Sequence, residues 1–225
     1  MRKILLLAVV CLVFVSSPTF GAIVYEGSLP VTLQLNPMNM MSMSMMTIDI
    51  AGQSDDWDDF TISLEYGMLM STTGMMGTRL TILGGMSMDG RMGQVVGFFN
   101  MMGTNMASNL DLGTLIGRSS SLGDPQTPAL LLEAPEGGQT RIGEFGEDGG
   151  YIGLVMPGST YYGWLHISGI YDIGTAYQRV IVDGWAYEDQ PGMPIGAGEV
   201  PLPGAVYLLG FGVLCLTRLS RRLKT

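Results

Sequence analysis

Residue types that commonly carry catalysis are scarce in the central part of this chain. His166 is the only histidine, and the two cysteines, Cys11 and Cys215, lie in apolar segments near the ends. The chain has no Gly-x-Ser-x-Gly motif of the kind that exposes a nucleophilic serine. Carboxylate pairs of the kind that hydrolyse glycosides are plentiful, but no spacing selects one pair. We therefore expect a non-catalytic protein in which His166 is a structural group.

Methionine is concentrated in residues 38–46, and more methionines follow further along the chain. Thioethers bind soft ions such as Cu(I), so this segment is a candidate metal site. The alternative is packing in an apolar core or a loose apolar loop, because methionine fills irregular gaps. The apolar face of the alternating pattern switches between Met45 and Met46, which predicts a β-bulge there.

A run of acidic residues at 55–59, Asp-Asp-Trp-Asp-Asp, offers carboxylate oxygens of the kind that bind calcium. Its spacing differs from the Asp-x-Asp-x-Asp-Gly pattern of a calcium loop. The other interpretation is a solvated turn with Trp57 directed inward. The sequence specifies no cofactor.

Charge excludes nucleic acid as a partner of the central region. The ends hold six of the 11 basic residues, so the region between them has five arginines against all 20 acidic residues, a net charge of −15. Such a surface repels phosphates. It favours solubility and attracts cations or basic partners.

The elements that position these residues are predicted to be short strands. With 33 glycines and 11 prolines the chain is poor in helix-forming stretches. Alternating and β-branched stretches separated by turn residues predict an antiparallel β-sandwich or a jelly-roll-like single domain. The predicted strands are residues 31–35, 60–66, 79–83, 94–99, 130–133, 140–145, 151–156, 161–168 and 179–187.

The strand at residues 161–168 is predicted to be central, because both of its faces carry large side chains. Trp164 and His166 share one face, and Leu165 and Ile167 share the other. Turns are expected at 148–150 and at Asp89-Gly90, the latter as a two-residue hairpin. The pattern of residues 105–112 is ambiguous and is compatible with a short helix.

The N-terminal 22 residues have the pattern of a signal peptide. Arg2 and Lys3 precede an apolar run at residues 4–15, and small residues follow Pro18. We expect a signal helix that signal peptidase removes after Gly21 or Ala22. An uncleaved anchor is the alternative, although the run is short for a bilayer.

Three parts follow one another at the C-terminus. A short motif is followed by an apolar stretch at 205–217 and a basic tail. The motif is Val200, Pro201, Leu202, Pro203 and Gly204, and the tail residues are Arg218, Arg221, Arg222 and Lys224. The apolar stretch predicts a single transmembrane helix whose basic tail stays at the cytoplasmic face. A permanent tail anchor is one interpretation of this arrangement.

This arrangement resembles the PEP-CTERM surface-sorting signals, in particular their VPLPA variant. The segments 150–154, 161–165 and 184–188 are similar to strands that precede such signals. The resemblance implies processing by an exosortase in a Gram-negative bacterium. The protein would pass from an inner-membrane intermediate to the cell surface or extracellular space, in association with exopolysaccharide and biofilm.

The expected organisation therefore has four parts: a signal peptide at 1–22, a β-rich domain at 23–190, a linker at 191–199 and a sorting signal at 200–225. The expected function is that of an exported, non-catalytic surface or matrix protein. The alternative is a surface module that binds a metal or carbohydrate, using residues 38–46 and 55–59.

Overall fold

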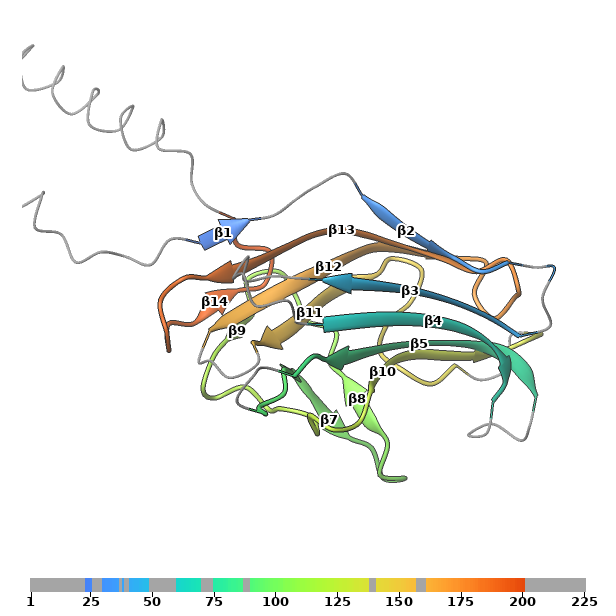
Figure 1. Ribbon diagram of the computed structural model, residues 1–225, viewed down its shortest axis with the longest axis horizontal. Coiled ribbons are helices and arrows are strands. Elements are labelled where there is room, and N and C mark those ends of the chain that lie inside the picture. Colours follow the sequence, from blue (N-terminus) through green and yellow to red (C-terminus); the bar gives the residue numbers. More distant parts are fainter. Residues whose placement is uncertain are drawn as a thin grey trace, which may run out of the picture.

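The computed structural model describes residues 23–25, 30–36, 38, 41–48, 60–69, 75–86, 90–137, 141–156 and 161–200. These residues are mostly β, and no helix occurs among them. The predicted signal and transmembrane helices lie outside this part of the chain. Figure 1 shows two layers of strands, an arrangement consistent with a β-sandwich.

The first sheet is antiparallel and is built around the two longest strands, β12 (Tyr162–Tyr171) and β13 (Arg179–Glu188). β11 (Gly150–Val155) and then β6 (Gln94–Val95) follow beyond β12. On the other side, β1 (Ile23–Tyr25) and β2 (Val31–Gln34) pair with opposite ends of β13. β12 is therefore central, as its two apolar faces predict.

The second sheet contains six strands in the order β3, β4, β5, β10, β8, β7. All its pairs are antiparallel except that of β10 with β8. The strands are β3 (Ser42–Ile48), β4 (Phe60–Met68), β5 (Met76–Gly84), β7 (Gly97–Phe99), β8 (Asn105–Ala107) and β10 (Ala129–Pro135).

The main core lies between the two sheets and takes apolar side chains from both of them. Phe60, Ile62 and Leu64 alternate along β4, while Leu165 and Ile167 face them from the first sheet. Alternation with period two is what gives each strand one buried face. A smaller cluster covers the opposite face of the first sheet, where Ile116, Trp164 and Ile195 are buried.

The smaller cluster lies under a two-stranded ladder of β9 (Leu115–Ile116) and β14 (Ile195–Gly196). Ile195 and Ala197 are fully buried there. Residues 191–199, the predicted linker, therefore include a segment packed onto the body. Their short apolar stretch is too weakly patterned to be recognised as a strand in the sequence.

Several predicted strands coincide with observed ones, but three local predictions were wrong, and one segment left open is now assigned. Residues 141–145 form no strand, and Ile142 makes only an isolated bridge to Glu133. In the segment left open, residues 105–107 form β8, because they pair with β7 and β10. The predicted strand at 94–99 is divided into β6 and β7, which belong to different sheets.

The third wrong prediction concerns the turn near Asp89-Gly90. Met86 pairs with Met92, so the reversal is longer than a two-residue hairpin. Gly90 does have a positive φ of 78°, the conformation that favours glycine at turns. The predicted turn at 148–150 is confirmed, since Gly149 bonds back to Gly146 with a φ of 69°.

Candidate functional site

The predicted processing sites lie at or beyond the limits of the described residues. Gly21 and Ala22 precede them, and Pro201 to Gly204 and the basic tail follow them. Val200 is the last described residue and is 47% exposed. Within the described ranges, no helix is long and apolar enough to cross a membrane.

The most concentrated group of aromatic and polar side chains lies on the outer face of the first sheet. The His166 ring on β12 stacks on Tyr151 of β11, with the ring centroids 4.3 Å apart. Tyr151 also meets Trp164 edge-on at 5.6 Å, and Tyr25 of β1 lies 6.0 Å from Trp164. We call Tyr25, Tyr151, Trp164, His166 and Asp183 the aromatic cluster.

Asp183 belongs to the cluster because of an irregularity in β13. The register between β12 and β13 pairs His166 with Gly184 but Ile167 with Val182, leaving Asp183 without a cross-strand partner. A bulge of this kind changes the direction of a side chain. Here the Asp183 carboxylate lies 2.7 Å from Nδ1 of His166. The sequence could not reveal this pair, because the bulge breaks the alternation that predicts faces.

The cluster is partly open to solvent and partly covered. Tyr25 is 44% exposed, whereas Trp164 is only 3% exposed and its Nε1 donates a hydrogen bond to the Glu199 carbonyl at 3.0 Å. The pKa of Tyr151 is raised by burial and then by the charge of Asp183. Tyr151 thus keeps its phenolic proton at neutral pH.

Chemically, the cluster offers ring faces next to a carboxylate and an imidazole. Sugars bind such surfaces through stacking and hydrogen bonds. Ser168, which neighbours the pair of His166 and Asp183, makes a different contact. Its Oγ donates to the Ile181 carbonyl at 3.5 Å.

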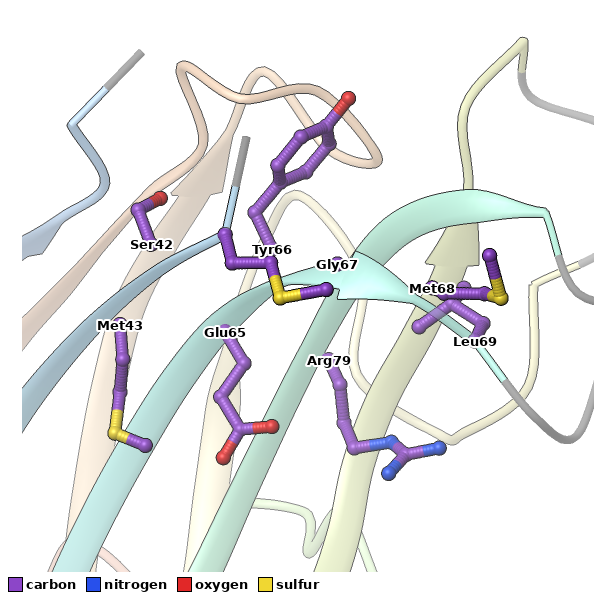
Figure 2. Close-up of a pocket in the computed structure, with 9 residues that line it drawn as sticks. Ser42, Met43, Glu65, Tyr66, Gly67, Met68, Leu69 and Arg79 are labelled. Carbon is purple, nitrogen blue, oxygen red and sulfur yellow. The ribbon is translucent and has the colours of Figure 1, made fainter. Parts of the chain in front are cut away.

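A second candidate is a hollow of about 530 Å³ at one end of β3, β4 and β5, lined partly by methionines. Figure 2 shows that Met43, Glu65 and Arg79 extend from one side of the strands, whereas Ser42 and Tyr66 extend from the other. Met68 lies at the far end of β4. The side chains of Met43 and Met68 point in different directions in this view.

Charges in this hollow are paired along the sheet. Arg79 lies in register between Glu65 on β4 and Glu133 on β10. Its Nε and Nη2 donate to one oxygen of Glu133 at 2.9 and 2.8 Å. Tyr66 donates to Glu136 at 3.0 Å, and its pKa is raised by burial and then by that carboxylate.

The predicted bulge was wrong, and the predicted packing of the methionines is confirmed for Met46, which packs against the core, but not for Met43 and Met45. β3 pairs with β4 in unbroken register from Ser42 to Ile48, so no bulge separates Met45 from Met46. Met43 and Met45 are neither core nor loop, since they are 56% and 60% exposed on this strand. Ser42 and Ser44 take the inward positions because Ile48 and Met46, on the same face, contact the core.

Metal binding has limited support among the described residues. They contain no group of three or more His, Cys, Asp or Glu side chains placed to hold a metal ion. The acidic run at 55–59 lies outside the described ranges.

No protein-family model matches the chain, and neither the curated proteins nor the solved structures contain a significant match.

Proposed function

We propose that this chain is an exported, non-catalytic structural protein of a Gram-negative bacterial surface or extracellular matrix, processed at both ends. The observation that carries this proposal is the order of motif, apolar stretch and basic tail over residues 200–225. A membrane-embedded sorting enzyme needs this order, because it places the motif at the outer face of the bilayer. Its similarity to VPLPA-type sorting signals supports an exosortase as the processing enzyme.

The N-terminus supports the same direction of transport. Arg2 and Lys3 stay on the cytoplasmic side while the chain after Ala22 is translocated. The central region has no cysteine, so folding outside the cytoplasm does not depend on disulfide formation. Its β-rich body, for which we propose a jelly-roll-like sandwich, stabilises itself by burying a core between two sheets.

The test is intact mass and terminal sequencing of the protein from membrane and extracellular fractions of its source cells. We expect the mature chain to begin near residue 23 and to lack residues 205–225. Changing Pro201 and Pro203 together to Ala should leave the C-terminal segment attached. Pro191→Ala, ten residues upstream of Pro201, is the control and should be processed normally.

Wild-type protein that keeps residues 205–225 in the membrane would contradict sorting. In that case the segment is a permanent anchor, and the proposed matrix function is wrong. Normal processing of the double Pro variant would show that the motif is not what the enzyme reads.

A second candidate function is carbohydrate binding, which the aromatic cluster favours specifically. Tyr25 presents 44% of its surface to solvent beside the hydrogen-bonding pair of His166 and Asp183. Stacking on an exposed ring combined with a carboxylate acceptor suits a neutral polysaccharide better than an anionic one, because the chain is acidic. This site would connect the protein to the exopolysaccharide of the matrix.

Glycan-array binding followed by calorimetry tests this second function. Tyr25→Ala should weaken binding at least about tenfold, as expected when roughly 1.4 kcal/mol of stacking is lost. Tyr177→Ala removes a ring that is 62% exposed outside the cluster, so its binding should equal that of the wild type. If both variants bind like the wild type, the cluster is structural.

A further inference from the structure

β3 forms one edge of the second sheet among the described residues. It runs for seven residues and pairs with β4 alone among the described residues. The other outer strands are shorter, with two residues in β6, three in β1 and β7, and four in β2. β7 is also engaged beyond its hairpin partner, since Gly97 donates to the Ser121 carbonyl at 3.0 Å.

Edge strands expose unpaired backbone groups, and proteins usually protect them by shortness, charge, proline or a bulge. β3 has none of these protections. Its register with β4 is regular, and its sequence Ser-Met-Ser-Met-Met-Thr-Ile contains neither charge nor proline. Figure 1 shows β3 lying along the length of β4. Such a strand is suited to receive another strand.

The charge distribution favours a second copy of this chain as the occupant. The protein has a net charge of −9, so two copies repel one another over most of their surface. Residues 27–48 contain no ionisable side chain. Along β3 two copies therefore approach without placing like charges directly opposite each other.

The side chains of β3 are also self-complementary. In antiparallel pairing of β3 with itself, residues of one face meet residues of the same face, because side chains alternate with period two. Met43 and Met45, which are 56% and 60% exposed, would then cover the same methionines of the second copy. Ser42 and Ser44 would meet their counterparts on the other face.

We propose that β3 pairs antiparallel with β3 of a second copy, joining the two second sheets across a two-fold axis. The axis passes through or next to one residue of β3. This inference goes beyond the proposed export and matrix function, and it depends on neither processing nor polysaccharide. The test distinguishes this self-pairing from two other arrangements. In one, β3 pairs with a basic or unrelated edge strand of a different protein. In the other, another segment of the same chain covers β3.

The first experiment is a cysteine scan along β3 in the full-length chain. Cys11 and Cys215 are changed to Ser so that the introduced cysteine is the only thiol. Positions Ser42, Met43, Ser44 and Met45 are changed to Cys one at a time and oxidised mildly. Disulfides require Cα atoms about 4.4 to 6.8 Å apart, so only the position nearest the axis should form an efficient covalent dimer.

Ser63→Cys is the matched control, since Ser63 faces Met45 on β4, one strand inside the edge. We expect no dimer from it, because β3 separates it from the second copy. A maximum at one β3 position supports the proposal. Equal cross-linking at all β3 positions and at Ser63 would overturn it, and so would no cross-linking at any position.

The second experiment measures the mass of the uncross-linked protein by light scattering. Met45→Lys keeps an exposed side chain on β3 and places two positive charges near the axis, so we expect loss of the dimer. Met102→Lys makes the same change at a residue 85% exposed beyond β7, at the opposite edge of the sheet. It should leave the dimer intact. Loss of the dimer in Met102→Lys would overturn two-fold pairing through β3.

Discussion

At the scale of single residues, the carboxylate of Glu133 is the most deeply buried charge in the described chain that has an ion-pair partner. Its side chain is 1% exposed, whereas Arg79 is 35% exposed. Both donated bonds go to one carboxylate oxygen, and the other oxygen, Oε1, is buried without a hydrogen-bond partner. The fold therefore depends on Arg79 to compensate this charge.

Replacing Arg79 by Met should lower the free energy of unfolding by about 3 kcal/mol, because it leaves a buried carboxylate unpaired. The measurement is urea denaturation at neutral pH. The double variant Arg79→Met with Glu133→Gln should lose clearly less, since the uncompensated charge is gone. Equal losses in both variants would show that packing of the arginine side chain, and not its charge, is what matters.

Glu188 gives the fold a dependence on pH. Its side chain is 6% exposed, and burial raises its pKa above the ordinary value of 4.5, while a hydrogen bond from Gln190 opposes the shift. The charge of Asp189 raises it further. A raised folded pKa means that the folded state binds more protons than the unfolded state. Stability contributed by this group therefore falls as pH rises from 4.5 through the raised value.

Glu188→Gln should make the protein more stable than the wild type at about pH 7, because the burial that raises the pKa of Glu188 destabilises the folded wild type above pH 4.5. Below pH 4.5 the two proteins should be equally stable, because the carboxyl is then protonated in both states. Denaturant titrations at several pH values measure the difference. A constant difference across that range would mean that the substitution changes packing instead of protonation.

At the scale of elements, bulges and turns decide where side chains point. The turn before β11 brings the backbone of Gly149 against the Ile167 carbonyl, leaving no room for a Cβ atom. Its φ of 69° is also a conformation that side chains disfavour. The turn therefore holds β11 and β12 in the register that stacks Tyr151 on His166.

Gly149→Ala should cost about 2 to 3 kcal/mol, since it combines backbone strain with a contact that must relax. Gly103→Ala separates the two effects. Gly103 has a similar φ of 75°, but no atom lies within 4 Å of the added Cβ. It should cost only about 1 kcal/mol. If thermal denaturation gave equal losses for both variants, the close approach to Ile167 would be unimportant.

At the scale of the whole molecule, a buried polar network joins the two sheets. Thr78 on β5 donates to the Gln178 side chain at 2.6 Å, and the Gly174 amide donates to both side chains. Thr78 and Gln178 are completely buried. Because Gly174 and Gln178 lie between β12 and β13, the network fixes the loop of the first sheet on the second.

Thr78→Val keeps the shape of the side chain and removes the hydroxyl. We expect it to lower the free energy of unfolding by about 1 to 3 kcal/mol, because the partners of the hydroxyl lose a buried hydrogen bond. Thr81→Val changes a half-buried residue on the outer face of the same strand and should stay within about 0.5 kcal/mol of the wild type. Similar losses would indicate that the network does not join the sheets.

Much of the strand content could be predicted from the sequence, because alternation and β-branched residues are local signals. The strands at 60–66, 151–156 and 179–187 were found in this way, with boundaries close to β4, β11 and β13. β8, β9 and β14 were missed, since strands of two or three residues carry too little pattern. These short strands are stabilised by pairing with strands that the fold brings next to them, and not by local propensity.

The amino-acid sequence by itself determined the acidic charge, the strand-rich character and the apolar segments at both ends, because these depend on composition and on neighbours along the chain. Only the tertiary structure decided that Met43 and Met45 face solvent and that Asp183 meets His166. The physical reason is that a strand's pattern defines two faces but not which one is buried. Register, bulges and the position of a strand at the edge of a sheet decide that, and they arise from partners distant in sequence.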